Sequence, residues 1–62
     1  MISWEIMLVA LEDTLNSGGV EFDNWEFDFI DNVYFRWKEG KTITQKEQKK
    51  ITKIYDRKFP SS

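Results

Sequence analysis

The clearest signal for the start of a helix in this chain of 62 residues is the stretch Phe22-Asp23-Asn24-Trp25-Glu26-Phe27. Asp23 and Glu26 have the spacing of a capping box, in which the side chain of each residue accepts a hydrogen bond from the backbone N–H of the other. Phe22 and Phe27 occupy the two positions of a hydrophobic staple around this box. The stretch therefore predicts that a helix begins at residue 24.

This helix is predicted to cover residues 24–39, because Gly40 can adopt the left-handed conformation that ends helices. At about 100° per residue, its apolar side chains fill one broad arc, which we expect to face the core. The arc consists of Phe27, Phe29, Ile30, Val33, Tyr34 and Trp37. Trp25 lies at the edge of this arc, and Phe35 projects from the opposite side.

A first helix is predicted over residues 3–17. Ser3 can serve as its N-cap, and the glycines at 18 and 19 permit the turn that ends it. Apolar side chains recur along it at the spacing of one buried face. They are Trp4, Met7, Leu8, Leu11 and Leu15.

A third helix is predicted over residues 44–58. Thr44 and Glu47 form a second capping box at its start. Thr42 and Gln45 offer an alternative capping box two residues earlier. The apolar stripe of this helix is narrow and contains Ile51, Ile54 and Tyr55.

Three helices and no extended alternating pattern predict an all-α fold, a compact three-helix bundle. Residues 1–62 are expected to form a single helical domain, with a short C-terminal tail over residues 59–62. We expect the core to be built from Trp4, Leu8, Leu11, Leu15, Phe29, Ile30, Val33, Trp37, Ile51 and Ile54.

The chain contains neither cysteine nor histidine. This composition excludes a disulfide, a thiol nucleophile, a serine–histidine triad and a conventional zinc site. We therefore expect no enzyme activity, no cofactor and no metal. The chain also lacks a basic leader and any apolar run of the roughly 18 residues that span a membrane, so a cytoplasmic location without membrane contact is predicted.

Charge divides the sequence at Arg36. Residues 1–35 contain eight carboxylates and no lysine or arginine, whereas residues 36–62 contain nine cations and three carboxylates. Such asymmetry indicates an electropositive face for an anionic partner, or two faces that attract each other or a second copy. A homodimer is therefore one of the alternatives. The acidic half is a further candidate surface, because it could occupy the basic groove of another protein.

The cations of the third helix fall within an arc of about 100°. This basic stripe consists of Lys46, Lys49, Lys50, Lys53 and Arg57. It could lie along a nucleic-acid backbone or on an acidic protein, or it could be a solvated helix face. Arg36 and Lys38, in the last turn of the second helix, would extend a contact with an anionic partner.

Trp25 and Phe35 form a second feature, because aromatic residues outside a buried arc are often anchors of protein interfaces. Asp28 and Asp31 lie close to them on the predicted helix. Neighbouring segments could instead cover the two rings. A third reading is that an exposed ring beside the cations stacks on a nucleic-acid base.

Three segments carry a resemblance to a known family: Trp25-Glu26-x-x-Phe29-Ile30-x-x-Val33, Gly40-Lys41-x-Ile43-Thr44-x-Lys46-Glu47, and Ile51 with Ile54-Tyr55. They resemble a short helical module of tailed phages. That module joins a W-x-x-F-I helix, a Gly-x-x-Leu-Ser-x-Lys-Gln turn and a helix that ends in Ile-Tyr. Here Ile43-Thr44 replaces Leu-Ser, and Glu47 replaces the usual glutamine.

The phage module occurs as small free-standing proteins and beside replication and recombination proteins, such as the UvsW helicase of T-even phages. The resemblance implies a non-enzymatic accessory protein in the cytoplasm of a bacterial host, which acts in phage DNA replication or recombination through weak nucleic-acid contact by the third helix. The alternative is a small phage protein that binds, and inhibits or adapts, a host or phage protein through its acidic and aromatic face.

Overall fold

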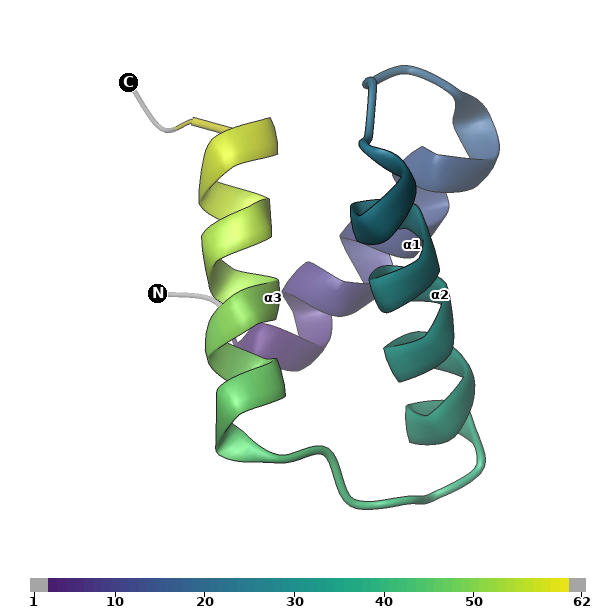
Figure 1. Ribbon diagram of the computed structural model, residues 1–62, viewed down its shortest axis with the longest axis vertical. Coiled ribbons are helices and arrows are strands. Elements are labelled where there is room, and N and C mark those ends of the chain that lie inside the picture. The colour runs from purple at the N-terminus through teal and green to yellow at the C-terminus, as the bar shows by residue number, and fades with distance from the viewer. Residues whose placement is uncertain (1–2, 61–62) are drawn as a thin grey trace.

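Three helices form the structure, a computed structural model that describes residues 3–60 (Figure 1). They are α1 (Trp4–Ser17), α2 (Asn24–Lys38) and α3 (Gln45–Lys58). The bounds agree with the predicted helices once the capping residues are set apart. No strand occurs within residues 3–60, so the all-α prediction is confirmed. The predicted tail, residues 59–62, lies partly outside the described residues.

Both predicted capping boxes are present. At the start of α2, the backbone N–H of Asp23 donates to Glu26 Oε1 at 2.9 Å. At the start of α3, the N–H of Glu47 donates to Thr44 Oγ1 at 3.3 Å, and the N–H of Thr44 donates to Glu47 Oε1 at 3.2 Å. The alternative capping box at Thr42 is therefore wrong, because the N-cap of α3 is Thr44, two residues after Thr42.

The end of α2 is a Schellman motif around Gly40, which has a φ of 84°. The N–H of Gly40 donates to the carbonyl of Trp37, and the N–H of Lys41 donates to the carbonyl of Arg36, each at 3.0 Å. These bonds satisfy two of the carbonyls that a helix end leaves unpaired. Gly18 ends α1 in the same left-handed conformation, with a φ of 72°.

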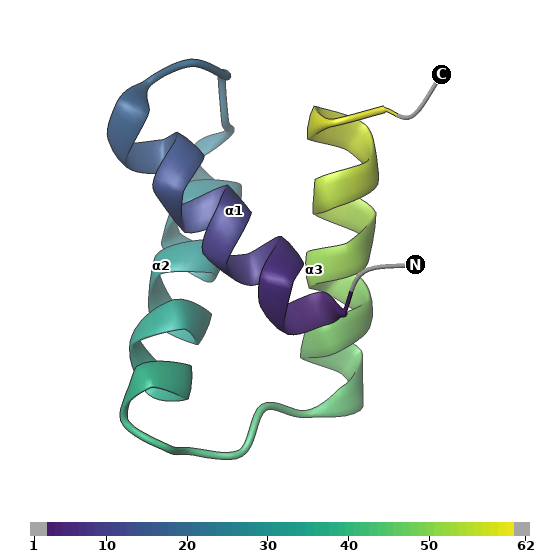
Figure 2. The same ribbon diagram turned by 180° about the vertical axis from the view of Figure 1, so that it is seen from behind.

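The helices α2 and α3 run side by side in opposite directions, and α1 crosses one face of the pair obliquely (Figures 1 and 2). Each of them contacts α1 more extensively than it contacts the other. The core therefore lies between α1 and the α2–α3 pair. The opposite face of the pair has no helix over it.

Most of the predicted core is buried, but its aromatic members are not at its centre. The buried apolar side chains are Met7, Leu8, Leu11, Ile30, Val33, Ile43, Ile51 and Ile54. Four predicted core residues are only partly buried and pack against the edge of this cluster: Trp4, Leu15, Phe29 and Trp37. Three short helices enclose a narrow core, which branched aliphatic side chains fill, so the larger rings cover its rim.

Phe27 is a further correction, because about half of its surface is exposed although the sequence placed it on the buried arc. The buried side chains of α2 are Glu26, Ile30 and Val33, and Phe27 lies outside the arc that these three define. Phe35 is 65% exposed, as expected from its position on the opposite side of the helix.

Candidate functional site

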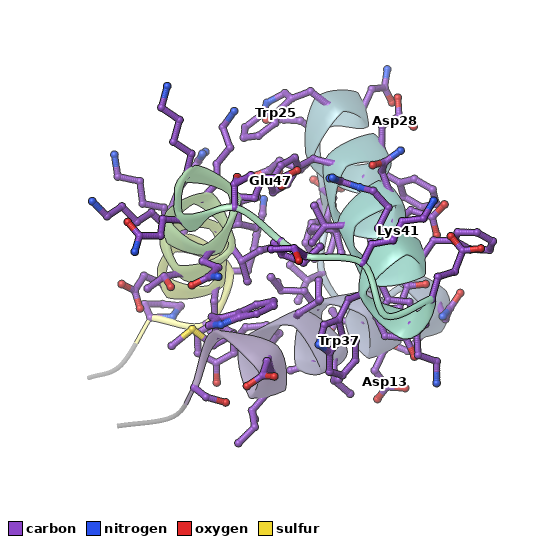
Figure 3. The ribbon with its side chains drawn as sticks, turned by 90° about the horizontal axis from the view of Figure 1, so that it is seen from below. Asp13, Trp25, Asp28, Trp37, Lys41 and Glu47 are labelled. Carbon is purple, nitrogen blue, oxygen red and sulfur yellow. The ribbon has the colours of Figure 1, made fainter. Side chains whose placement is uncertain are left out.

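The uncovered side of α3 carries the cations that the sequence predicted as a stripe. Figure 3 shows side chains tipped with nitrogen that radiate from α3 away from α1. Lys46, Lys49, Lys50 and Lys53 are exposed, and Arg57 is exposed as well. We call these five residues, together with Trp25 across from them on α2, the basic face. Its cations are exposed to solvent, and among them Arg57 also lies 3.6 Å from Glu26.

Trp25 belongs to the basic face because Lys50 lies against its ring. Lys50 Nζ is 5.8 Å from the ring centroid of Trp25 and 5.4 Å from that of Phe29, within the range of a cation–π contact. The tryptophan remains 47% exposed and extends above the space between α2 and α3 (Figure 3). The structure therefore joins one of the two predicted aromatic anchors to the basic stripe.

Arg36 is not available to a partner in the way the sequence suggested. Its guanidinium forms an ion pair with Glu47, and its Nε donates to Asn32 Oδ1 at 2.9 Å. The hydrogen bond from Arg36 is the main cause that lowers the pKa of Glu47. This pair joins the last turn of α2 to the first turn of α3, which is a structural role.

Lys38 also lies apart from the basic face. Its Nζ is 5.7 Å from the ring centroid of Tyr34, whose ring packs against Trp37 at a centroid separation of 6.0 Å. Trp37 faces α1, so Lys38 lies on the other side of α2 from Trp25. Neither cation of α2 therefore adds to the contact surface of α3.

Sequence reasoning missed a buried carboxylate, since it assigned Glu26 to helix capping alone. Glu26 has no exposed surface, and its Oε1 is 3.1 Å from Lys58 Nζ. Lys58 also donates to the backbone carbonyl of Glu21 at 2.8 Å, and its Nζ is 5.1 Å from the ring centroid of Phe22. The sequence contained a signal for the burial of Glu26, because this residue is four positions before Ile30 and therefore lies on the same face of the helix.

The charge of Glu26 is maintained by its hydrogen bonds. Burial alone would raise the pKa of its carboxyl group, because a low-dielectric surrounding disfavours the charged form. The N–H of Asp23, the ammonium of Lys58 and the guanidinium of Arg57 outweigh burial, so the pKa is lowered overall. Glu26 is therefore an ionised residue that joins the start of α2 to the end of α3.

The second predicted anchor, Phe35, lies on a separate surface. Asp28 and Asp31 are exposed near it on α2, and Asp28 points away from α3 in Figure 3. Burial and the charge of Asp31 raise the pKa of Glu12 on the neighbouring helix. We call the surface formed by Asp28, Asp31 and Phe35 the acidic–aromatic surface. The predicted protein interface is thus divided, because Trp25 lies beside the basic stripe and not on the acidic–aromatic surface.

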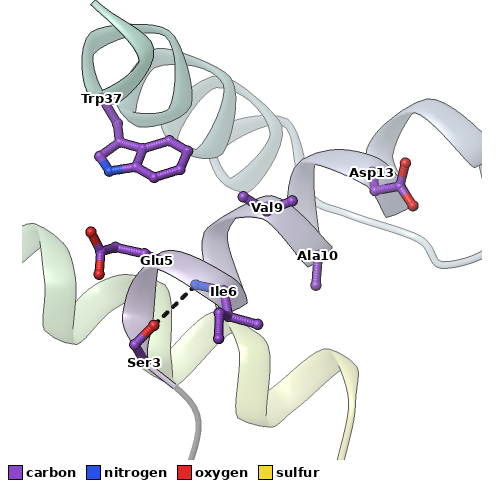
Figure 4. Close-up of a pocket in the computed structure, with 7 residues that line it drawn as sticks. All are labelled: Ser3, Glu5, Ile6, Val9, Ala10, Asp13 and Trp37. Carbon is purple, nitrogen blue, oxygen red and sulfur yellow. Dashed lines mark hydrogen bonds between the residues drawn. The ribbon is translucent and has the colours of Figure 1, made fainter. Parts of the chain in front are cut away.

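A third surface, which sequence reasoning missed, is an open hollow of about 510 Å³ on the outside of α1 (Figure 4). We call it the α1 groove. It is lined by Ser3, Glu5, Ile6, Val9, Ala10, Asp13 and Trp37. Ile6 is 56% exposed and Val9 is 43% exposed. The signal for this surface was a second apolar stripe, at the spacing of three and four residues, on the side of the helix away from its buried face.

Comparison of the chain with protein-family models, curated proteins and solved structures finds no match. Within residues 3–60, no three histidine, cysteine, aspartate or glutamate residues lie together as metal ligands. No helix in this part of the chain has the length and apolar character that crossing a membrane requires.

Proposed function

We propose that this protein is a non-enzymatic module that binds single-stranded nucleic acid through the basic face. The observation that carries the proposal is the half-exposed ring of Trp25 beside Lys50, next to four further exposed cations. Proteins that bind single strands combine cations that follow the phosphates with aromatic rings on which bases stack. The resemblance to a phage module supports a role for this contact in phage DNA replication or recombination.

The binding is expected to be weak and sensitive to salt. The basic face gathers five of the nine cations, whereas the eight carboxylates of residues 1–35 repel phosphate. Four or five phosphate contacts on a single strand predict a slope of about −3 when log affinity is plotted against log salt concentration. The measurement is the fluorescence anisotropy of a labelled oligonucleotide, single-stranded and double-stranded, across a range of salt concentrations.

A pair of matched variants tests the site. Lys49→Glu with Lys53→Glu reverses two cations of the basic face, and Lys38→Glu with Lys41→Glu reverses two exposed cations outside it. We expect the first variant to abolish binding and the second to retain most of it. Equal loss in both variants would mean that net charge alone, rather than the basic face, controls binding.

Trp25→Ala tests the role of the aromatic ring. We expect this variant to lose one stacked base, which weakens binding by about 1–3 kcal/mol, or roughly 5-fold to 150-fold in affinity. Phe35→Ala removes an exposed ring of the acidic–aromatic surface and should leave the affinity unchanged. If Trp25→Ala binds as the parent protein does, the ring takes no part in the contact and the preference for single strands should be absent.

A second candidate function is inhibition or adaptation of a host or phage protein through the acidic–aromatic surface. It is supported by Phe35, which is the most exposed large apolar side chain of the described residues and lies near two aspartates. Phe35→Ala should remove this activity and should spare nucleic-acid binding. Affinity capture with the parent protein and with each variant separates the two candidates.

A further inference from the structure

The α1 groove presents apolar surface that no part of the described chain covers. Ile6 and Val9 are about half exposed although both are aliphatic, and Ala10 and the ring of Trp37 border them. Ile6, Val9 and Ala10 follow the spacing of three and four residues that aligns side chains along one face of a helix. Such a strip matches the apolar stripe of a second helix lying alongside α1.

The rim of the groove has a definite charge. Glu5 and Asp13 border it, two turns apart on α1, and none of its lining residues is a cation. Every residue of α1 belongs to the half of the sequence that lacks lysine and arginine. Charge complementarity therefore favours an occupant that carries cations about two turns apart beside an apolar stripe.

A second copy of this protein does not fit the groove. Antiparallel pairing of two α1 helices about a two-fold axis through Val9 would bring Glu5 of one copy to Asp13 of the other. Like charges in contact disfavour such an interface. Pairing of the groove with the basic face of another copy would place Ile6 and Val9 mainly against lysines. The aliphatic side chains of α3 itself are buried, so the ring of Trp25 is the only apolar group that this face could offer them within residues 3–60.

We propose that the α1 groove binds an amphipathic helix of a partner protein, one that carries lysine or arginine beside its apolar stripe. The apolar side chains of that helix would pack on Ile6, Val9 and Trp37, in the helix-in-groove mode of recognition. Its cations would lie against Glu5 and Asp13. The groove lies on the opposite side of the molecule from Trp25 (Figure 3), so the two surfaces can be occupied together.

The test is a titration of the isotope-labelled protein with two designed helical peptides, followed by the chemical shifts of its backbone amides. Each peptide has about 18 residues, enough for a stable helix, with leucines at helical spacing. One peptide carries lysines beside the leucines, and the other carries glutamates at the same positions. We expect the lysine peptide to shift the amides of Ile6, Val9 and Ala10 and to bind at least about tenfold more tightly than the glutamate peptide.

Two variants and one control establish the site. Ile6→Gln with Val9→Gln removes exposed apolar surface and should abolish binding of the lysine peptide. Phe35→Gln makes the same kind of change outside the groove and should have no effect. Glu5→Lys with Asp13→Lys should reverse the preference, so that the glutamate peptide binds more tightly. Circular dichroism checks that each variant retains its helices.

Several results would overturn the proposal. It is wrong if neither peptide produces saturable shifts, if both bind equally well, or if the shifts occur around Trp25. Shifts of Ile6 and Val9 that depend on protein concentration alone would instead identify a second copy as the occupant. Because no nucleic acid is present in this titration, its outcome is independent of the proposed function of the basic face.

Discussion

Glu26 carries a charge at a position where α2 otherwise buries isoleucine and valine. Its carboxylate accepts from the N–H of Asp23 and lies beside Lys58, so one side chain both caps a helix and joins two helices. Breaking a buried ion pair from one side is costly, because the remaining charge stays buried without its partner.

Lys58→Met tests this arrangement at the scale of the residue. We expect it to lower the free energy of unfolding by about 3 kcal/mol, at the low end for buried pairs because Arg57 still lies 3.6 Å from Glu26. Lys53→Met removes an exposed lysine of the same helix and should change stability by less than about 0.5 kcal/mol. Urea denaturation of both variants measures the difference, and equal values would show that Lys58 does not stabilise Glu26.

At the scale of the element, the helices are defined by their ends. Each of α2 and α3 begins with a capping box whose glutamate pairs with a cation in the last turn of the other helix: Glu26 with Lys58, and Glu47 with Arg36. In antiparallel helices, the positive end of one dipole lies beside the negative end of the other. Both ion pairs have the charges that these two dipoles favour.

Gly40→Ala tests the end of α2. An added Cβ would meet no atom within 4 Å, so the expected cost comes from the left-handed backbone alone, about 1–2 kcal/mol. Gly19→Ala is the matched control, since the φ of Gly19 is not positive and alanine there should be neutral or slightly stabilising. In thermal denaturation, we expect Gly40→Ala to have a clearly lower Tm than Gly19→Ala. The reverse order would contradict the role of the Schellman motif.

At the scale of the whole molecule, α1 separates two surfaces of opposite character. The basic face lies on the uncovered side of the α2–α3 pair, and the α1 groove with its acidic rim lies on the other side. The ion pairs at the two ends of α2 and α3 supplement the limited contact between those helices. The contribution of these ion pairs to stability is therefore expected to depend on pH.

The folded state lowers the pKa of both Glu26 and Glu47 below the ordinary value of 4.5. Their contribution to stability is thus complete above that value and is lost as pH falls through the lowered pKa values. Glu12 acts in the opposite direction, because its pKa is raised and its protonation in acid relieves an unfavourable charge. We expect a net fall in the free energy of unfolding as pH decreases below about 4.5.

Urea denaturation at several pH values measures this fall. Glu26→Gln with Glu47→Gln should flatten the dependence, since neither site then titrates. Glu12→Gln is the control and should leave the fall intact or make it steeper. An unchanged profile in the double variant would assign the acid sensitivity to other carboxylates.

The fold class, the three helices and their capping residues can all be predicted from the sequence, because caps and glycine ends depend on groups within a few residues of one another. The aliphatic centre of the core followed from periodicity as well. Periodicity did not distinguish the centre of an apolar arc from its border, so Phe29 and Trp37 were expected inside the core and lie at its edge.

Which cations face solvent, and which surfaces meet, depends on the way the three helices pack together. Arg36 pairs with a residue 11 positions away, and Lys58 contacts the carbonyl of a residue 37 positions away. Trp25 lies beside Lys50 because α2 and α3 run in opposite directions, and the α1 groove is exposed because both helices pack on the other side of α1. Such contacts depend on how helices are placed in space, which the local pattern of each helix does not specify.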